Sequence, residues 1–200
     1  MKAGAAHGFS LVELLIAVLV TLVLAASVFS LLNRLQRTAG YQSEVQEVLA
    51  LGMTCMETVE RIFLQAGNDP LGAGFPALVI AGPAEVRVRA DLTGSAHGDP
   101  DRGDPDGDTE DSGEDVTIRY KENTRSLEII PQGGVPQPVA TGLSAFAMQY
   151  LDAGGAETAA GNDVRGVRVT LTGASLHADP QTGRPFSVQL SSYISLAAKK

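Results

Sequence analysis

The longest hydrophobic pattern in the chain lies near its start, from Phe9 to Leu32. This segment contains one charged residue, Glu13, among residues that are mostly apolar. Its twenty-four residues would extend roughly 36 Å as a helix at about 1.5 Å per residue, enough to cross the about 30 Å hydrocarbon core of a bilayer. The pattern therefore predicts a membrane-spanning helix. A lone carboxylate costs roughly 2.5–3.5 kcal/mol inside such a span, so Glu13 is expected to have a specific role and a partner.

The helical pattern continues beyond the apolar segment. Small or apolar residues recur there at alternating steps of four and three, which places them on one face of a helix. They are Tyr41, Val45, Val48, Gly52, Cys55, Val59, Ile62 and Ala66. Residues 33–66 are therefore expected to form an amphipathic continuation of the same helix, ending before Gly67-Asn68-Asp69-Pro70. Because Cys55 lies on this stripe, we interpret it as a buried small residue rather than a reactive thiol.

After residue 66 the hydrophobic period changes from 3.6 to 2. Alternation of this kind occurs in residues 85–90, 116–120, 127–129, 146–150, 167–172 and 186–191. It is typical of antiparallel strands with one buried face, and the helical stripe would cover that face. The predicted fold is α+β, with one long N-terminal helix packed on an antiparallel β-sheet head at residues 67–200.

The negative charge of the chain is concentrated in one segment. Residues 98–115 carry seven aspartates, two glutamates and one arginine, a net charge of −8 that equals the charge of the whole chain. One interpretation is a calcium site in which Asp104, Asp106, Asp108 and Asp115 supply oxygen ligands. The match to an EF-type loop is partial, because Thr109 occupies the position of the usual glycine. The alternative is a solvated acidic loop without a ligand.

Composition limits the remaining possibilities. A single cysteine excludes an intrachain disulfide and a cysteine-based zinc site. The acidic net charge argues against a nucleic-acid partner. The histidines, His7, His97 and His177, have no partner at metal-ligand spacing, and no G-x-S-x-G motif occurs. We therefore expect a protein that is not an enzyme and that has no cofactor other than the possible calcium.

The N-terminus resembles that of type IV prepilins and type II secretion pseudopilins. The matching residues are the basic leader with Lys2, the Gly8-Phe9 junction, and the run from Ser10 to Ile16 that contains Glu13. An ordinary secretory signal peptide cut near Ala26, or a plain signal anchor, would not explain the positions of Gly8-Phe9 and Glu13.

The resemblance implies how the chain is processed and placed. A prepilin peptidase would remove the leader, residues 1–8, by cutting between Gly8 and Phe9, and would methylate the new amino group of Phe9. Residues 9–32 would span the inner membrane once, with the head in the periplasm, and would later form the core of a pilus or pseudopilus. There Glu13 would pair with the N-terminal ammonium of another pilin, minor or major, and set the register.

The head adds weaker similarities. The turn at residues 66–70 and the segments at 90–94, 116–120 and 137–152 look like those of PilW-type minor pilins, and the J-type minor pseudopilins of type II secretion share much of this layout. The resemblance thus implies a non-catalytic minor pilin in pilus assembly, initiation or the tip. The alternatives are a J-type pseudopilin and, from another class, a calcium-dependent adhesin or binding head carried on a pilin helix.

Overall fold

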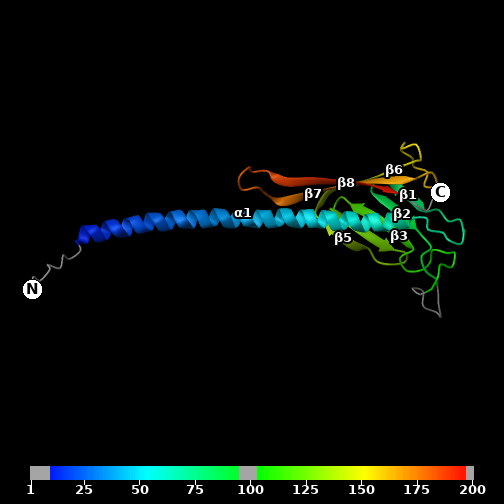
Figure 1. Ribbon diagram of the computed structural model, residues 1–200, viewed down its shortest axis with the longest axis horizontal. Helices are drawn as coiled ribbons and strands as arrows, with labels where there is room; N and C mark the ends of the chain where they lie inside the picture. The colour runs from blue at the N-terminus through cyan, green and yellow to red at the C-terminus, as the bar shows by residue number, and fades with distance from the viewer. Residues whose placement is uncertain (1–9, 95–102, 197–200) are drawn as a thin grey trace, which may run out of the picture.

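One helix runs through the length of the molecule. The computed structural model describes residues 10–94 and 103–196, and its α1 comprises Leu11–Gln65, 55 residues that extend about 82 Å at 1.5 Å per residue (Figure 1). The C-terminal half of α1 lies along the β-rich head, and the N-terminal half projects from it. The prediction of a single continuous helix is confirmed.

The described part of the chain after α1 forms antiparallel strands. Their bounds are β1 Leu78–Gly82, β2 Glu85–Arg89, β3 Asp115–Lys121, β4 Ser126–Pro131, β5 Gln137–Thr141, β6 Leu143–Leu151, β7 Gly166–Ala178 and β8 Pro185–Ser195. β1 to β5 form a five-stranded sheet in sequence order, and β6, β7 and β8 form a three-stranded sheet. The predicted α+β class, a long helix followed by antiparallel strands, is confirmed.

The head differs from the expected single sheet in being divided into two. The chain passes from β5 to β6 through Gly142, whose φ of 83° is a left-handed conformation that favours glycine. Leu143 then donates its backbone N–H to the carbonyl of Arg125 at 3.1 Å and begins the second sheet. The alternation of residues did not identify β1 and β5, which are both five-residue strands at the edges of the first sheet.

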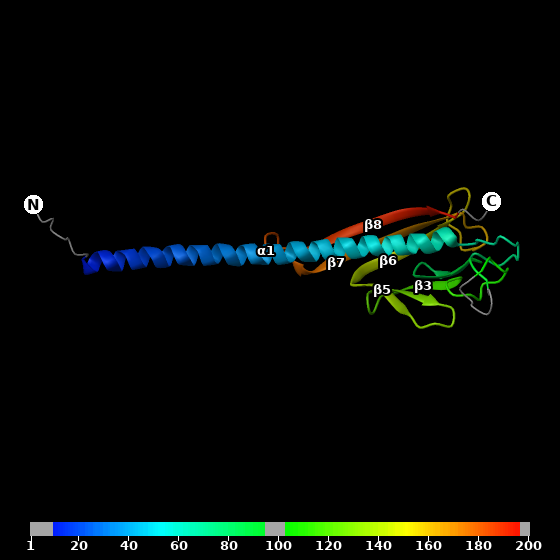
Figure 2. The same cartoon turned by 60° about the horizontal axis from the view of Figure 1, so that its bottom comes forward.

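The hydrophobic core lies where the stripe of α1 meets both sheets. Four residues on this face of the helix are fully buried: Cys55, Val59, Phe63 and Ala66. They pack in one cluster with Ile118 of the first sheet and with several residues of the second. In both views of the molecule β8 lies on one side of α1 and β3 and β5 on the other (Figure 2). The helix therefore joins the two sheets.

Hydrogen bonds of the backbone and of one side chain hold the turn that follows α1. Gly67 has a φ of 74°, and its N–H donates to the carbonyl of Arg89 in β2 at 2.8 Å. The carboxylate of Asp69 accepts hydrogen bonds from the amides of Ala73 and Gly74, each at 2.8 Å. These hydrogen bonds lower the pKa of the Asp69 carboxyl, and the Gly74 amide makes the largest contribution. The predicted stop at residues 67–70 is confirmed.

A second contact fixes the long β7–β8 hairpin, which extends along α1 toward its N-terminal half (Figure 1). The Glu44 carboxylate accepts hydrogen bonds from the backbone amides of Leu176 and His177 and contacts His177 Nδ1 at 3.0 Å. The His177 amide is the main cause of the lowered pKa of Glu44, to which the His177 side chain and the Leu176 amide also contribute. The hairpin is thereby attached to the helix beyond the predicted membrane span.

The core assignment predicts unequal effects at neighbouring positions. Phe63→Ala should lower the free energy of unfolding by about 3–5 kcal/mol, because the fully buried ring would leave a cavity between helix and sheets. Leu64→Ala is the matched control: this side chain is 58% exposed, and its loss should change the free energy by less than about 0.5 kcal/mol. Chemical denaturation of the full chain in detergent measures both, and equal effects would contradict the assignment.

The Glu44 contact predicts a pH-dependent hairpin. Because the folded-state pKa of Glu44 lies below its ordinary value of 4.5, its contribution is present above pH 4.5 and is lost as the pH falls through the lowered pKa. Hydrogen exchange should show the protection factors of the Leu176 and His177 amides falling in that range. Glu44→Ala should reduce them at every pH, whereas Glu47→Ala, at an exposed neighbouring position, should not. Unchanged protection in Glu44→Ala would show that Glu44 does not hold the hairpin.

Candidate functional site

The projecting half of α1 is a continuous apolar surface. From Leu11 to Leu32 every residue is exposed, and the best 18-residue window of the helix has a mean hydropathy of 2.8. Two of its polar side chains are satisfied within the helix: Thr21 and Ser27 donate to the carbonyls four residues before them, at 2.8 and 2.9 Å. Such a helix leaves few unpaired polar groups and has the length and composition to cross a membrane.

Glu13 lies in the first turn of this helix. Ser10 is the N-cap residue, and its hydroxyl accepts a hydrogen bond from the Glu13 N–H at 3.2 Å, while the Glu13 carboxylate accepts one from the Ser10 N–H at 3.0 Å. This reciprocal capping box satisfies two amide donors that a helix start leaves unpaired. The sequence reasoning missed it, although the Ser-x-x-Glu spacing of Ser10 and Glu13 is its usual signal.

The predicted cleavage and methylation residues, Gly8 and Phe9, lie outside the described residues. The structure does place the start of α1 directly after them, with Ser10 as its cap. The predicted cut would therefore leave a new N-terminus one residue before the cap and four residues before Glu13. The positive end of the helix dipole and the new ammonium would then lie near the same carboxylate.

The acidic segment is not a uniform loop. Asp115, predicted as a calcium ligand, is buried at the start of β3, where its carboxylate pairs with the guanidinium groups of Arg87 and Arg89 in β2. This hydrogen bond and charge pair raises the pKa of Arg87. The other three predicted ligands, Asp104, Asp106 and Asp108, are exposed. The structure thus separates Asp115 from the three residues with which it was grouped.

Two of the exposed aspartates in the acidic segment accept local hydrogen bonds from the backbone. Asp106 and Asp108 each accept a backbone N–H from two residues further on, at 3.3 and 2.8 Å. In residues 10–94 and 103–196, no three His, Cys, Asp or Glu side chains are grouped so as to hold a metal ion. Calcium binding by the three exposed aspartates therefore stays a prediction.

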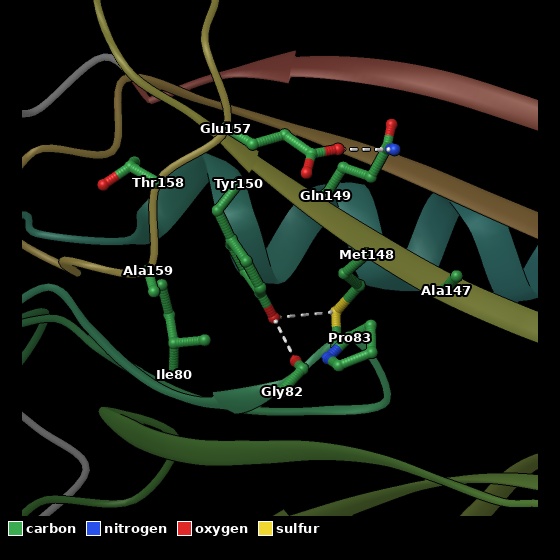
Figure 3. A pocket seen from close by; sticks show the side chains of 10 residues that line it. All are labelled: Ile80, Gly82, Pro83, Ala147, Met148, Gln149, Tyr150, Glu157, Thr158 and Ala159. Atoms are coloured by element: carbon green, nitrogen blue, oxygen red, sulfur yellow. Dashed lines mark hydrogen bonds between the residues drawn. The ribbon is translucent and has the colours of Figure 1, made fainter.

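A cavity of about 540 Å³ lies between the two sheets, with Pro83 after β1 and Met148 and Tyr150 of β6 in its wall (Figure 3). The Tyr150 hydroxyl donates to the carbonyl of Gly82 at 3.1 Å, and burial raises its pKa. Glu157 at the rim accepts a hydrogen bond from Gln149 at 2.8 Å. The Glu157 carboxylate and the Tyr150 hydroxyl of this cavity are thus both engaged in structural hydrogen bonds.

Cys55 is also structural. It is fully buried in the helix stripe, as predicted, and burial raises the pKa of its thiol to about 11. A thiol with so high a pKa is protonated near neutral pH and is a poor nucleophile.

The comparisons with known proteins bear on the N-terminal segment. A family model described as the prokaryotic N-terminal methylation motif matches residues 4–29, which include Gly8, Phe9 and Glu13. The comparison with curated proteins gave no match. The motif supports a type IV pilin-like or pseudopilin-like protein, and together with the exposed apolar helix it is consistent with anchoring in a membrane.

Proposed function

We propose that this protein is a non-catalytic minor pilin that takes part in the assembly, initiation or tip of a type IV pilus. The observation that carries the proposal is the division of α1 into an apolar half exposed on all sides and a half packed in the head, with the methylation motif on the exposed half. A prepilin peptidase would cut between Gly8 and Phe9 and methylate Phe9. The mature chain would lie in the inner membrane with its head in the periplasm.

The exposed half of α1 supplies the assembly surface. In the membrane it contacts lipid, and in a filament the same residues would pack against the helices of other minor and major pilins. These contacts join different surfaces of successive subunits and do not close into a ring, so they extend a filament. The head stays outside this core, because among the described residues α1 packs on the sheets with its C-terminal half.

Glu13 would set the register of this packing. In a helix that extended to Phe9, Glu13 would lie four residues further on, about 6 Å along the axis at 1.5 Å per residue. In a staggered bundle the Phe9 ammonium of one subunit would reach Glu13 of its neighbour, and any other stagger would leave two charges unpaired in an apolar core. The hydrogen bond to the Ser10 amide orients the carboxylate at this end of the helix.

The assignment to PilW-type minor pilins rests on the head. The Ala-Gly-x-x-Pro turn at residues 66–70 closes α1 through Gly67, and the loop it begins is held by Asp69. This geometry supports the likeness seen in the sequence. A J-type pseudopilin would use the same helix and turn in a short periplasmic filament. Recovery of the protein in filaments sheared from the cell surface favours the pilus, and its retention in the periplasm favours the pseudopilus.

Substitution of Glu13 tests the register separately from the capping box. Glu13→Gln keeps an oxygen that can accept the Ser10 N–H but removes the charge, whereas Glu13→Ala removes both. In cells with the filament machinery, mass spectrometry should show every variant cut after Gly8 and methylated at Phe9. Both variants should reach the filament fraction at least about tenfold less than the wild type, because one unpaired ion in an apolar core costs more than about 1.4 kcal/mol.

Glu57→Gln, at an exposed position in the other half of α1, is the matched control and should assemble normally. Normal assembly of Glu13→Gln together with failure of Glu13→Ala would assign the role to capping and overturn the register proposal. A mature chain beginning near Ser27, as a signal peptide cut after Ala26 would leave, would overturn the pilin proposal as a whole.

A further inference from the structure

One buried carboxylate of the head lacks part of its expected contacts. Asp91, which follows β2, is 0% exposed, and its Oδ2 accepts the N–H of Gly107 at 3.0 Å. Its Oδ1 is buried and has no hydrogen-bond partner among residues 10–94 and 103–196. Leaving a charged oxygen in this state costs free energy unless a cation or a donor reaches it.

Hydrogen bonds on both sides hold the main chain of Asp91 in place. Its N–H donates to the carbonyl of Asn68 at 2.7 Å, and its own carbonyl accepts a hydrogen bond from the Asn68 side chain at 2.6 Å. Asn68 belongs to the turn that ends α1. The main chain that carries this carboxylate is thus fixed at the junction between the helix and the first sheet.

Neighbouring buried acids are compensated in other ways. Glu114 is 1% exposed, and its Oε1 accepts the amides of Leu92 and Thr93 at 2.7 and 2.8 Å. Asp115 pairs with Arg87 and Arg89. Asp91 has one amide and no basic partner among the contacts described for it, which distinguishes it within the cluster.

Further oxygen atoms lie close to the same segment. The hydroxyl oxygen of Thr93, two residues after Asp91, is also buried, and it has no hydrogen-bond partner in the part of the chain that the structure describes. At Gly94 an added Cβ would lie 2.4 Å from the carbonyl oxygen of Asp104 and 3.0 Å from Cβ of Asp106. Residues 104–107 of the acidic segment thus lie directly against residues 91–94, and Gly94 permits this close approach.

We propose that this junction binds a calcium ion, with Asp91 Oδ1 as its anchoring ligand and Thr93 Oγ1 as a second ligand. Calcium accepts carboxylate, hydroxyl, carbonyl and water oxygens in variable number, so it does not need three converging acidic side chains. Water and the exposed Asp106 would complete the shell. This site replaces the ligand set expected from the sequence, because Asp115 is engaged by two arginines.

The site would have a structural effect. A cation at Asp91 would tie the acidic segment to the end of α1 through the contacts with Asn68 and Gly107. Those contacts are distant in sequence from Glu13 and from the assembly surface. The proposal is therefore independent of the pilin function, and either can fail without the other.

The experiment uses the full chain in detergent micelles. Thermal unfolding is followed by circular dichroism in chelator and in about 10 mM calcium chloride, tenfold above the weakest Kd usual for extracellular calcium modules, with sodium chloride at equal ionic strength as the reference. Isothermal titration calorimetry measures the stoichiometry. Binding at a tenfold excess over Kd stabilises by about 1.4 kcal/mol, so the wild-type Tm should rise by about 3–6 °C with one calcium per chain.

Two variants locate the ion. Asp91→Asn should abolish the calcium-dependent shift, and in chelator it should be at least as stable as the wild type because a buried unpaired charge is removed. Thr93→Val, which is close to isosteric, should weaken calcium binding by about tenfold and serves if Asp91→Asn does not fold. Asp163→Asn, at an exposed position between β6 and β7, is the control and should keep the full shift.

Three results would overturn the proposal. The first is a wild-type Tm that does not differ between calcium and the sodium reference. The second is a calcium shift that persists in Asp91→Asn or, if that variant is unfolded, a shift that is undiminished in Thr93→Val. The third is an equal loss of the shift in Asp163→Asn, which would indicate diffuse screening of acidic charge rather than a site.

Discussion

The structure depends on one constraint: a single helix must suit an apolar environment in its N-terminal half and a sheet surface bordered by water in its C-terminal half. The N-terminal half of α1 is apolar on every face, as contact with lipid or with other apolar helices requires. The C-terminal half is apolar on one stripe, because it packs against sheets on that side and meets water on the others. The two halves share one uninterrupted backbone, Leu11–Gln65. The Glu44 contact attaches the β7–β8 hairpin close to where these surroundings meet.

The sequence was most informative where a pattern is local and periodic. The alternating steps of four and three predicted the buried stripe because a helix repeats at about 3.6 residues whatever packs against it, and Cys55 and Val59 are indeed fully buried. Strand alternation identified β7 in the same way. It could not show that β5 and β6 belong to different sheets, since the break depends on a single left-handed residue, Gly142. Nor did it identify β5, a short edge strand that contains Pro138.

Sequence reasoning was weaker for the acidic segment, where the contacts are long-range. Spacing alone made Asp115 equivalent to Asp104, yet Asp115 lies opposite Arg89 in the register of β2 and β3 and pairs with Arg87 as well. Likewise Asp91 and Glu114 look like ordinary surface acids in the sequence, and only the fold buries them. The capping box of Ser10 and Glu13 is the opposite case: it is local, its spacing is informative, and it was overlooked.

Two carboxylates, Glu13 and Asp91, have part of their hydrogen bonding supplied by a backbone amide of the chain but no basic partner in the contacts described for them. The first would lie in an apolar filament core and the second lies in the interior of the head, and in both surroundings an uncompensated charge is unfavourable. Asp115 shows that this chain does place arginines beside a buried carboxylate. We propose that a positive charge from outside the chain compensates both positions: an ammonium of another subunit at Glu13, and a metal ion at Asp91.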